Sequence, residues 1–409
     1  MRCLFTPAGL PQKVLPLMIA MLVAGSFPPA RAQTTPASSL EATLDPSEKF
    51  RDGISLVWSP VGNAAWDALR RYHKVEKIEM NPRSVTAEKL NAFAFDQTRV
   101  LPKGTLIFAA DDSHEFREMV RAALRRQVGE NAARMIGPYL PPAQIQRDPP
   151  IFRLKSALIV SSIACRPKFP AGFVIESTPR MFLDRKGKAH RTTGFGATGG
   201  RAGTYATAVQ VLEDDLAGNH ALHFTLTTGD ERDFQCLVLS TPGTHQNLES
   251  NMKHVRDLLR KERIPQRAVE KDGKRWRYTD TLEPNDVLWV PFLKASLMSD
   301  FPELVGKKYL SRMVGGEEYW WQLREATQLL SMRLDHEGAM VEATFVVPAD
   351  FLTSGGGPAS PQVPVAELPL YPKRFVFDRP FIASLWREGA EWPYLACWVD
   401  GPELLSVVK

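Results

Sequence analysis

Cysteine is scarce in this chain, with four residues among 409. Cys3 lies in an N-terminal segment that we expect to be removed, so Cys165, Cys236 and Cys397 remain. An odd number of cysteines in an exported protein excludes a framework in which every cysteine is paired. Each of the three lies in an apolar, strand-like run, so we predict buried free thiols.

Motifs of enzymes and metal sites are also missing. The chain has no Cys-x-x-Cys, no His-Glu-x-x-His and no Gly-x-Ser-x-Gly. His220 and His223 stand three apart in an expected strand, which puts them on opposite faces. The string from Gly194 to Gly199 fits the dinucleotide fingerprint, but more glycine and a strand follow it, so we predict a flexible hairpin loop. We therefore expect no catalytic residue, no metal and no cofactor. A secreted hydrolase is the alternative that composition and export leave open.

Apart from the N-terminal segment, the chain has no long apolar run. Residues 1–32 read as an export signal: Arg2 and Lys13 supply positive charge, Val14–Phe27 is largely apolar, and Ala30-Arg31-Ala32 offers a cleavage site before Gln33. The alternative is an uncleaved anchor helix. No later stretch approaches about 18 apolar residues, so we expect no membrane association after cleavage. The predicted location is the extracellular space or the periplasm.

Charge of one sign does not dominate. The formal charge of +5 falls by three, to +2, when residues 1–32 leave, because they carry three basic and no acidic residues. The basic runs at Arg125-Arg126 and Lys271–Arg277 are therefore interpreted as solvated faces, and we predict no nucleic-acid partner.

What the sequence does contain is an ordinary globular composition, 44% hydrophobic and 24% charged, with 32 prolines. We predict a polar linker over 33–46 and one domain over 47–409. Helices are expected after Ser59-Pro60, over Phe116–Gln127, over Asn251–Arg263 and from a cap at Ser299-Asp300. Most of the remaining segments are strand-like, including Ala157–Ala164, and the order of elements favours an α+β fold.

The last quarter of the chain is the most informative. Gln328–Ala343 gives a buried strand that runs into an acidic residue and a glycine, and a long loop rich in proline and glycine follows. Two apolar strands, Phe377–Phe381 and Pro393–Pro402, then end the chain. This order resembles the reactive-loop region of the serpins. Similar stretches upstream extend the resemblance over roughly residues 45–405: Ile54–Leu69, Ser161–Phe173, His220–Pro242 and Val290–Asp300.

The resemblance implies a serpin-like fold with large mixed sheets, helices packed at one end and an exposed reactive-type loop, here residues 339–374. It also implies a monomer that inhibits an extracellular or periplasmic serine or cysteine protease, by insertion of the cut loop into the main sheet. The hinge would be formed by residues that match the family's glycine and the small residues around it: Glu337, Gly338, Ala339, Val341 and Ala343.

Insertion requires small apolar side chains on one face and backbone donors throughout. Alternation from Ala339 to Phe345 meets the first demand. Phe345 is bulky for the role, Pro348 would remove a hydrogen bond, and residues 128–156 leave little room for the elements that usually cover the sheet. In that region Glu130–Leu140 is read as a shortened remnant. A non-inhibitory binding or structural protein of the same fold is therefore the alternative.

The position of the reactive bond differs with the direction of counting. Fifteen residues from Gly338 lead to Leu352-Thr353. Counting back from Phe377–Pro380 leads to Pro369, where Leu370-Tyr371 is the nearest bond that avoids proline. The long loop between the two anchors accounts for the disagreement. Both candidates place leucine before the bond, which suits proteases that prefer a medium-sized apolar side chain.

Overall fold

The computed structural model describes residues 39–111, 113–136, 157–228, 233–312, 318–323, 326–346 and 369–407. The predicted signal segment, residues 1–32, lies outside them. Within these ranges strands in five sheets combine with α-helices, so the predicted α+β class is confirmed. None of the helices in these ranges is both long and apolar enough to span a membrane.

A five-stranded antiparallel sheet forms the main face of the molecule. Its strands, in spatial order, are β14 (Leu293–Asp300), β17 (Thr327–Asp335), β18 (Gly338–Val346), β5 (Ala157–Cys165) and β4 (Leu106–Asp111). The middle strand thus comes from the segment in which the hinge was predicted.

A seven-stranded sheet shares one apolar core with the five-stranded sheet. Its strands, in spatial order, are β1 (Leu40–Thr43), β2 (Ser55–Trp58), β21 (Leu395–Val399), β20 (Phe381–Arg387), β10 (Gln235–Ser240), β9 (His220–Leu226) and β8 (Val209–Asp214). The prediction of a linker over 33–46 is wrong for β1, which pairs in parallel with β2 because Leu40 and Leu44 are buried in the core.

Smaller sheets complete the fold. A four-stranded sheet has the order β19 (Arg374–Val376), β13 (Val287–Pro291), β7 (Ala189–Ala197) and β6 (Val174–Leu183). A three-stranded sheet has the order β16 (Glu318–Gln322), β15 (Lys308–Arg312) and β3 (Met80–Asn81), and β11 (Gln266–Lys271) and β12 (Lys274–Thr279) form a hairpin.

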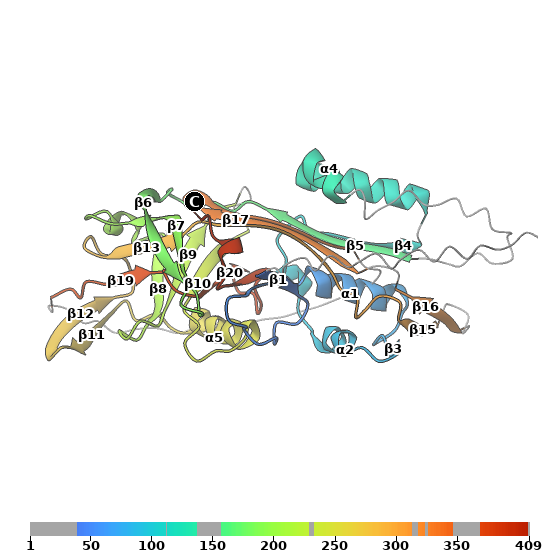
Figure 1. Ribbon diagram of the computed structural model, residues 1–409, viewed down its shortest axis with the longest axis horizontal. Helices are drawn as coiled ribbons and strands as arrows, with labels where there is room; N and C mark the ends of the chain where they lie inside the picture. Colours follow the sequence, from blue (N-terminus) through green and yellow to red (C-terminus); the bar gives the residue numbers. More distant parts are fainter. Residues whose placement is uncertain are drawn as a thin grey trace, which may run out of the picture. The chain divides into compact units, whose positions relative to one another are not determined.

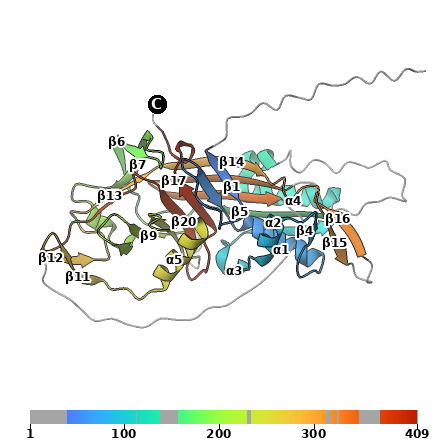
Figure 2. The ribbon, with the colours of Figure 1, turned by 60° about the horizontal axis from the view of Figure 1, so that its bottom comes forward.

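The α-helices are α1 (Val61–Tyr72), α2 (Val85–Ala92), α3 (Gln97–Val100), α4 (His114–Ile136) and α5 (Leu248–Arg260). Helix α1 follows Ser59-Pro60 as predicted and packs beneath β4, β5 and β18. Helices α1 and α2 lie at one end of the five-stranded sheet, while α4 lies across its outer face (Figure 1). Figure 2 shows α5 beside the seven-stranded sheet, which it contacts at β8 and β21.

Two local predictions are corrected. The segment Gly194–Ala197 is part of strand β7 rather than a flexible loop, because a Cβ atom on Gly194 would lie 2.3 Å from the Val290 carbonyl oxygen. The glycines of this segment leave room for the neighbouring strand β13, which lies close to their backbone. Ser299-Asp300 does not cap a helix: both residues end strand β14, where the Asp300 carboxylate accepts a hydrogen bond from the Thr327 hydroxyl at 2.7 Å.

Candidate functional site: the hinge strand and the arm after the loop

The predicted hinge forms the second strand of a tight hairpin. Asp335 on β17 pairs with Gly338 on β18, so His336 and Glu337 alone make the turn. The backbone N–H of Glu337 donates to the Asp335 carboxylate at 2.8 Å, which stabilises the turn locally. Gly338, Ala339, Val341 and Ala343 therefore lie in β18, while Glu337 precedes the strand.

Strand β18 is hydrogen-bonded on both sides. It pairs with β17 along its whole length, and with β5 from Val341 opposite Cys165 to Val346 opposite Val160. The expectation that the exposed loop begins at Ala339 is thus wrong: exposure cannot begin before the strand ends at Val346. The physical reason is that this strand fills the central position of the sheet while the chain is uncut.

The turn end of the hairpin is fastened to the segment that follows β5. Ala339 donates its backbone N–H to the Pro167 carbonyl at 2.9 Å, and Phe169 donates to the Glu337 carbonyl at 2.9 Å. Space is tight here, because a Cβ atom on Gly338 would lie 2.3 Å from the Pro167 carbonyl oxygen. Glycine at 338 is therefore needed for the inserted arrangement.

The inner face of β18 is apolar, as its alternation predicts. Ala339, Val341, Ala343 and Phe345 are between 0% and 7% exposed. The Phe345 ring lies 5.7 Å from the Phe301 ring, centroid to centroid. Its bulk does not prevent insertion, because the core accommodates the side chain with only 1% of its surface exposed.

The outer face of β18 meets helix α4. Thr344 shares a buried hydrogen bond of 2.9 Å with Ser162 on β5, and Glu342 forms an ion pair of 3.0 Å with Arg166. Val346 packs in one apolar cluster with Val120 and Leu124 of α4. The sheet therefore has a cover over this face, and α4 is one helix through Ile136 rather than a helix ending at Gln127 followed by a remnant.

Buried polar side chains flank the inserted strand. Gln328 on β17 and Ser161 on β5 both stand directly opposite Phe345, one on each side of it. Both are fully buried, and neither side chain has a hydrogen-bond partner among the described residues. Asn63 on α1 is buried in the same core and also lacks a side-chain partner there. Neither the burial nor the missing partners could be inferred from the sequence, which shows only polar residues in apolar runs.

The loop after β18 is long enough for an uncut chain. Pro348, Leu352 and Thr353 lie outside the described residues, so this reactive-bond candidate has no structural description. Residues 347–368 separate β18 from Pro369. At about 3.3 Å per residue such a segment spans up to roughly 70 Å, whereas a nine-residue strand covers about 30 Å. The strand can therefore occupy the sheet without a cut.

The arm after the loop is held along its backbone. The Arg277 N–H donates to the Pro369 carbonyl at 2.6 Å, and the Tyr371 N–H donates to the Arg277 carbonyl at 2.9 Å. The Leu370-Tyr371 bond thus lies beside the edge of β12, although the Leu370 side chain is exposed. A protease must pair with a substrate strand itself, so these hydrogen bonds oppose cleavage at this candidate bond.

A buried ion pair fixes the next residues. The Lys373 ammonium lies 2.8 Å from the Asp286 carboxylate, and both side chains are fully buried. Asp286 also accepts the Lys373 backbone N–H at 2.7 Å. Strand β19 follows immediately and pairs in parallel with β13. Sequence reasoning missed Lys373, because a lysine within a polar loop gives no sign of complete burial.

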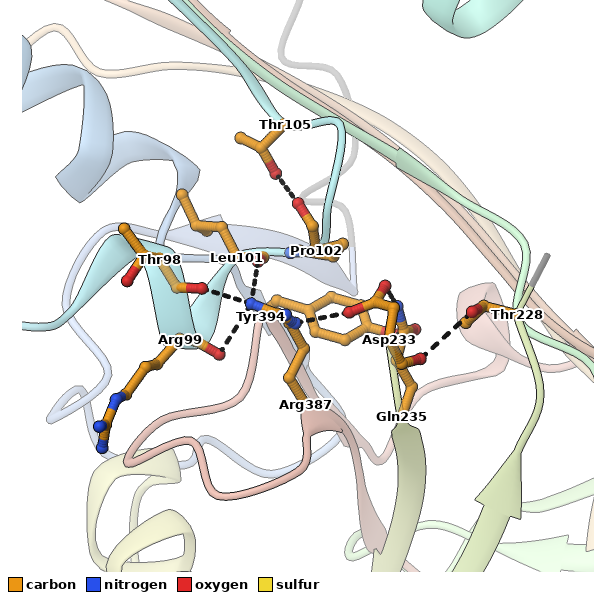
Figure 3. Close-up of polar contacts among 10 residues, drawn as sticks. All are labelled: Thr98, Arg99, Leu101, Pro102, Thr105, Thr228, Asp233, Gln235, Arg387 and Tyr394. Atoms are coloured by element: carbon orange, nitrogen blue, oxygen red, sulfur yellow. Dashed lines mark hydrogen bonds and ion pairs between the residues drawn. The ribbon is translucent and has the colours of Figure 1, made fainter. Parts of the chain in front are cut away.

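Figure 3 shows a polar cluster at the ends of β10 and β20. Arg387 donates to the Asp233 carboxylate at 2.7 Å and to carbonyl oxygens at the end of α3, including that of Leu101 at 3.0 Å. Gln235 joins Asp233 to the Tyr394 hydroxyl through two hydrogen bonds of 2.7 Å. Because the Arg387 and Asp233 charges are paired with each other, this cluster links the end of α3 to the seven-stranded sheet.

The cysteines supply no nucleophile in this part of the chain. All three are free, and Cys236 and Cys397 are fully buried, as predicted, whereas Cys165 is partly buried. Burial raises the pKa of the Cys165 thiol and of the Cys236 thiol to about 12, and that of Cys397 also lies above its usual range. The reactive thiolate is therefore suppressed. Among the described residues no group of three His, Cys, Asp or Glu is placed to hold a metal.

Comparison with known proteins gives structural likeness alone. No family model matches the sequence, and no curated protein matches it. A loop C-sheet serpin polymer is 10% identical, with 86% of this chain and 91% of that chain covered at a TM-score of 0.42. Cleaved serpin 42Da is 13% identical, covering 87% and 92% at 0.43. The thermophilic serpin Tengpin in its latent state is 10% identical, covering 88% and 94% at 0.40.

Proposed function

We propose that this chain is a divergent serpin-fold protein that keeps its hinge strand in the main sheet while uncut, and that it serves as a stable binding protein rather than a protease trap. One observation carries the proposal. Strand β18 pairs with both β17 and β5, while β19, beyond the loop, remains paired with β13.

Cleavage of the loop could release little further folding free energy. A trap needs a metastable intact form whose strand pairing and burial occur only after the cut. Here Val341, Ala343 and Phe345 are already buried and the ladder to β5 is already formed. Cutting the loop would therefore liberate its ends without a further gain in burial, and a protease would treat the chain as an ordinary substrate.

Export, a monomeric state and the absence of a catalytic role belong to the same proposal. They are supported by the signal-like residues 1–32, by the resemblance to serpins and by the suppressed cysteine thiolates. The binding partner in this proposal is extracellular or periplasmic.

Limited proteolysis within residues 347–368, followed by calorimetry, tests the proposal. We expect the melting temperature of the nicked protein to lie within about 3 °C of that of the intact protein. If strand insertion instead followed the cut, burial of several apolar side chains at about 1.5–3 kcal/mol each would raise it by roughly 10 °C. Such a rise would refute the proposal.

A second candidate, protease inhibition, is favoured by the buried side chains without partners. Withdrawal of β18 would let β17 and β5 approach, and Gln328 and Ser161 could then hydrogen-bond to each other. An accessible form with β18 outside the sheet would act as an inhibitor. Incubation with a panel of serine and cysteine proteases tests this directly: an SDS-stable complex supports it, and cleavage without any complex rejects it.

A further inference from the structure

A hollow of about 480 Å³ lies away from the hinge strand, between three separate segments. Lys49 and Phe50 come from the connection between β1 and β2, Arg185 from the β6–β7 turn, and residues 243–246 from the connection before α5. The volume falls within the range of small-molecule sites, about 300–1,000 Å³. None of the described residues that line it is an Asp or a Glu.

Arg185 is held in place by two aromatic rings. Its guanidinium carbon lies 4.6 Å from the centre of the Trp398 ring and 5.7 Å from that of Phe50. These two rings are stacked on each other at 4.2 Å. The backbone N–H of Arg185 donates to the Asp400 carboxylate at 2.7 Å, and Gly53 donates to the second oxygen of the same carboxylate at 2.7 Å. Both the backbone and the guanidinium group of Arg185 are therefore held in position.

Stacking occupies the face of the guanidinium and leaves its edge free. The N–H donors lie in the plane of the group, where they can meet two oxygens of one anion. Asp52 forms an ion pair with the guanidinium at 3.8 Å, and its exposed carboxylate lies too far away for a hydrogen bond. Arg185 thus has donors directed by the fold without a matching acceptor at hydrogen-bond distance.

Lys49 and His245 add a second and a third donor to the hollow. Phe50 donates its backbone N–H to the Gln246 carbonyl at 2.8 Å, which fixes the Lys49 segment against the segment that carries His245. The His245 ring lies 5.0 Å from the ring of His254, whose Nε2 is 2.7 Å from the Glu213 carboxylate. The hollow therefore combines two cationic side chains, one of them held between rings, with an imidazole that can take up a proton.

We propose that this hollow binds a tetrahedral oxyanion, a phosphate or sulfate group, through Arg185, Lys49 and His245. The Arg185 fork contacts two oxygens, Lys49 supplies charge, and the His245 ring donates to a third oxygen. Phe50 offers an apolar wall to the organic part of a monoester. This binding function is independent of the hinge strand and goes beyond the function proposed above.

Protonation of His245 is linked to binding. Burial lowers the pKa of His245, the neighbouring His254 lowers it further, and Glu213 opposes both. Arg185 and Lys49 are the other charged residues that line the hollow. A bound dianion offsets these charges and raises the pKa of His245. The affinity for sulfate, which stays a dianion over this range, is therefore expected to increase as the pH falls from 8 to 6.

Calorimetric titration with inorganic phosphate, inorganic sulfate and glycerol phosphate tests the proposal, with ionic strength held constant by chloride. We expect saturable binding that Arg185→Gln weakens at least tenfold and Lys49→Gln weakens several-fold. Lys188→Gln provides the matched control, because Lys188 is exposed in the same turn without lining the hollow. Tighter binding of glycerol phosphate identifies an organic monoester as the ligand, and equal binding identifies the free ion.

Two results would overturn the proposal: phosphate acting no more strongly than chloride, or equal affinity of the wild type and Arg185→Gln. Circular dichroism and a urea titration establish that Arg185→Gln is folded. Arg185→Lys gives a second readout, because it keeps the charge but removes the two-pronged contact. Affinity between those of the wild type and Arg185→Gln is expected, and affinity equal to wild type would contradict the assigned role of the guanidinium.

Discussion

Replacing Gln328 by leucine should stabilise the protein, and the sign of this effect reports where β18 lies. With β18 in the sheet, the Gln328 amide is fully buried and has no hydrogen-bond partner among the described residues. A buried polar group without a partner costs about 1–3 kcal/mol, and leucine of similar size removes that cost. We therefore expect the free energy of unfolding to rise by about 1–3 kcal/mol.

The corresponding change in melting temperature follows from the size of the domain. Unfolding entropy of about 2.1 cal/mol/K per residue gives roughly 0.8 kcal/mol/K for a domain of this length, so the shift is about 1–4 °C upward. Urea titration and calorimetry of Gln328→Leu measure it. Ser331→Ala, on the opposite face of the same strand, is the control and should change stability by less than about 0.5 kcal/mol.

Destabilisation by Gln328→Leu would refute the reasoning. If β18 were outside the sheet in solution, β17 and β5 could approach and Gln328 could pair with Ser161. Leucine would then remove a hydrogen bond and leave a buried hydroxyl without its partner, which lowers stability by about 1 kcal/mol or more. The change in the free energy of unfolding of Gln328→Leu therefore has opposite signs for the stable binding protein and for the protease trap.

Three further predictions concern the same framework. Gly338→Ala should destabilise the protein by about 3 kcal/mol, because the added Cβ would lie 2.3 Å from the Pro167 carbonyl oxygen. Gly389→Ala is the control: it is also at positive φ but in open space, and should cost only about 1 kcal/mol. Equal urea midpoints for the two variants would contradict this prediction. Lys373→Met should lower the free energy of unfolding by about 3–5 kcal/mol, because it leaves Asp286 buried without its counter-ion. The double variant Lys373→Met, Asp286→Asn should recover part of this loss. A loss below about 1 kcal/mol in the single variant would contradict the prediction and show that the pair is hydrated. Burial lowers the pKa of His73 from 6.5 to about 4, so the unfolded chain takes up the proton at a higher pH than the folded chain does. The free energy of unfolding should therefore be full above pH 6.5 and fall by about 3 kcal/mol as the pH drops to 4. His73→Gln should show a flatter pH profile, and an unchanged profile would contradict the prediction.

The faces of β18 could be predicted from the sequence, whereas its place in the molecule could not. Alternation from Ala339 to Phe345 assigns an apolar face correctly, because side chains alternate across a strand. The same alternation is required of a loop that waits outside the sheet and of a strand already inside it. The choice depends on pairing with β5, about 180 residues earlier in the chain.

Other differences arise because one residue type serves several structures. Gly194 and Gly196 suggested a flexible loop, yet they permit close packing of β7 against β13. Ser299-Asp300 has the composition of a helix cap but ends an antiparallel strand. Buried partners such as Lys373 and Asp286 lie far apart in sequence, and pattern reasoning from local segments cannot pair them. The oxyanion hollow likewise draws on three segments whose proximity depends on the fold.

The central position of β18 also constrains the order in which the chain can assemble. Strands β4 and β5 and helix α4 are synthesised before residue 166, whereas the strand that pairs with the free edge of β5 comes only after residue 337. Until then β5 presents unpaired backbone groups, which can pair with the edge of another chain. An exported chain would pass through this stage during translocation, so a holding chaperone would benefit it most before its last quarter emerges. The completed β17–β18 hairpin closes that edge and ends the vulnerable period.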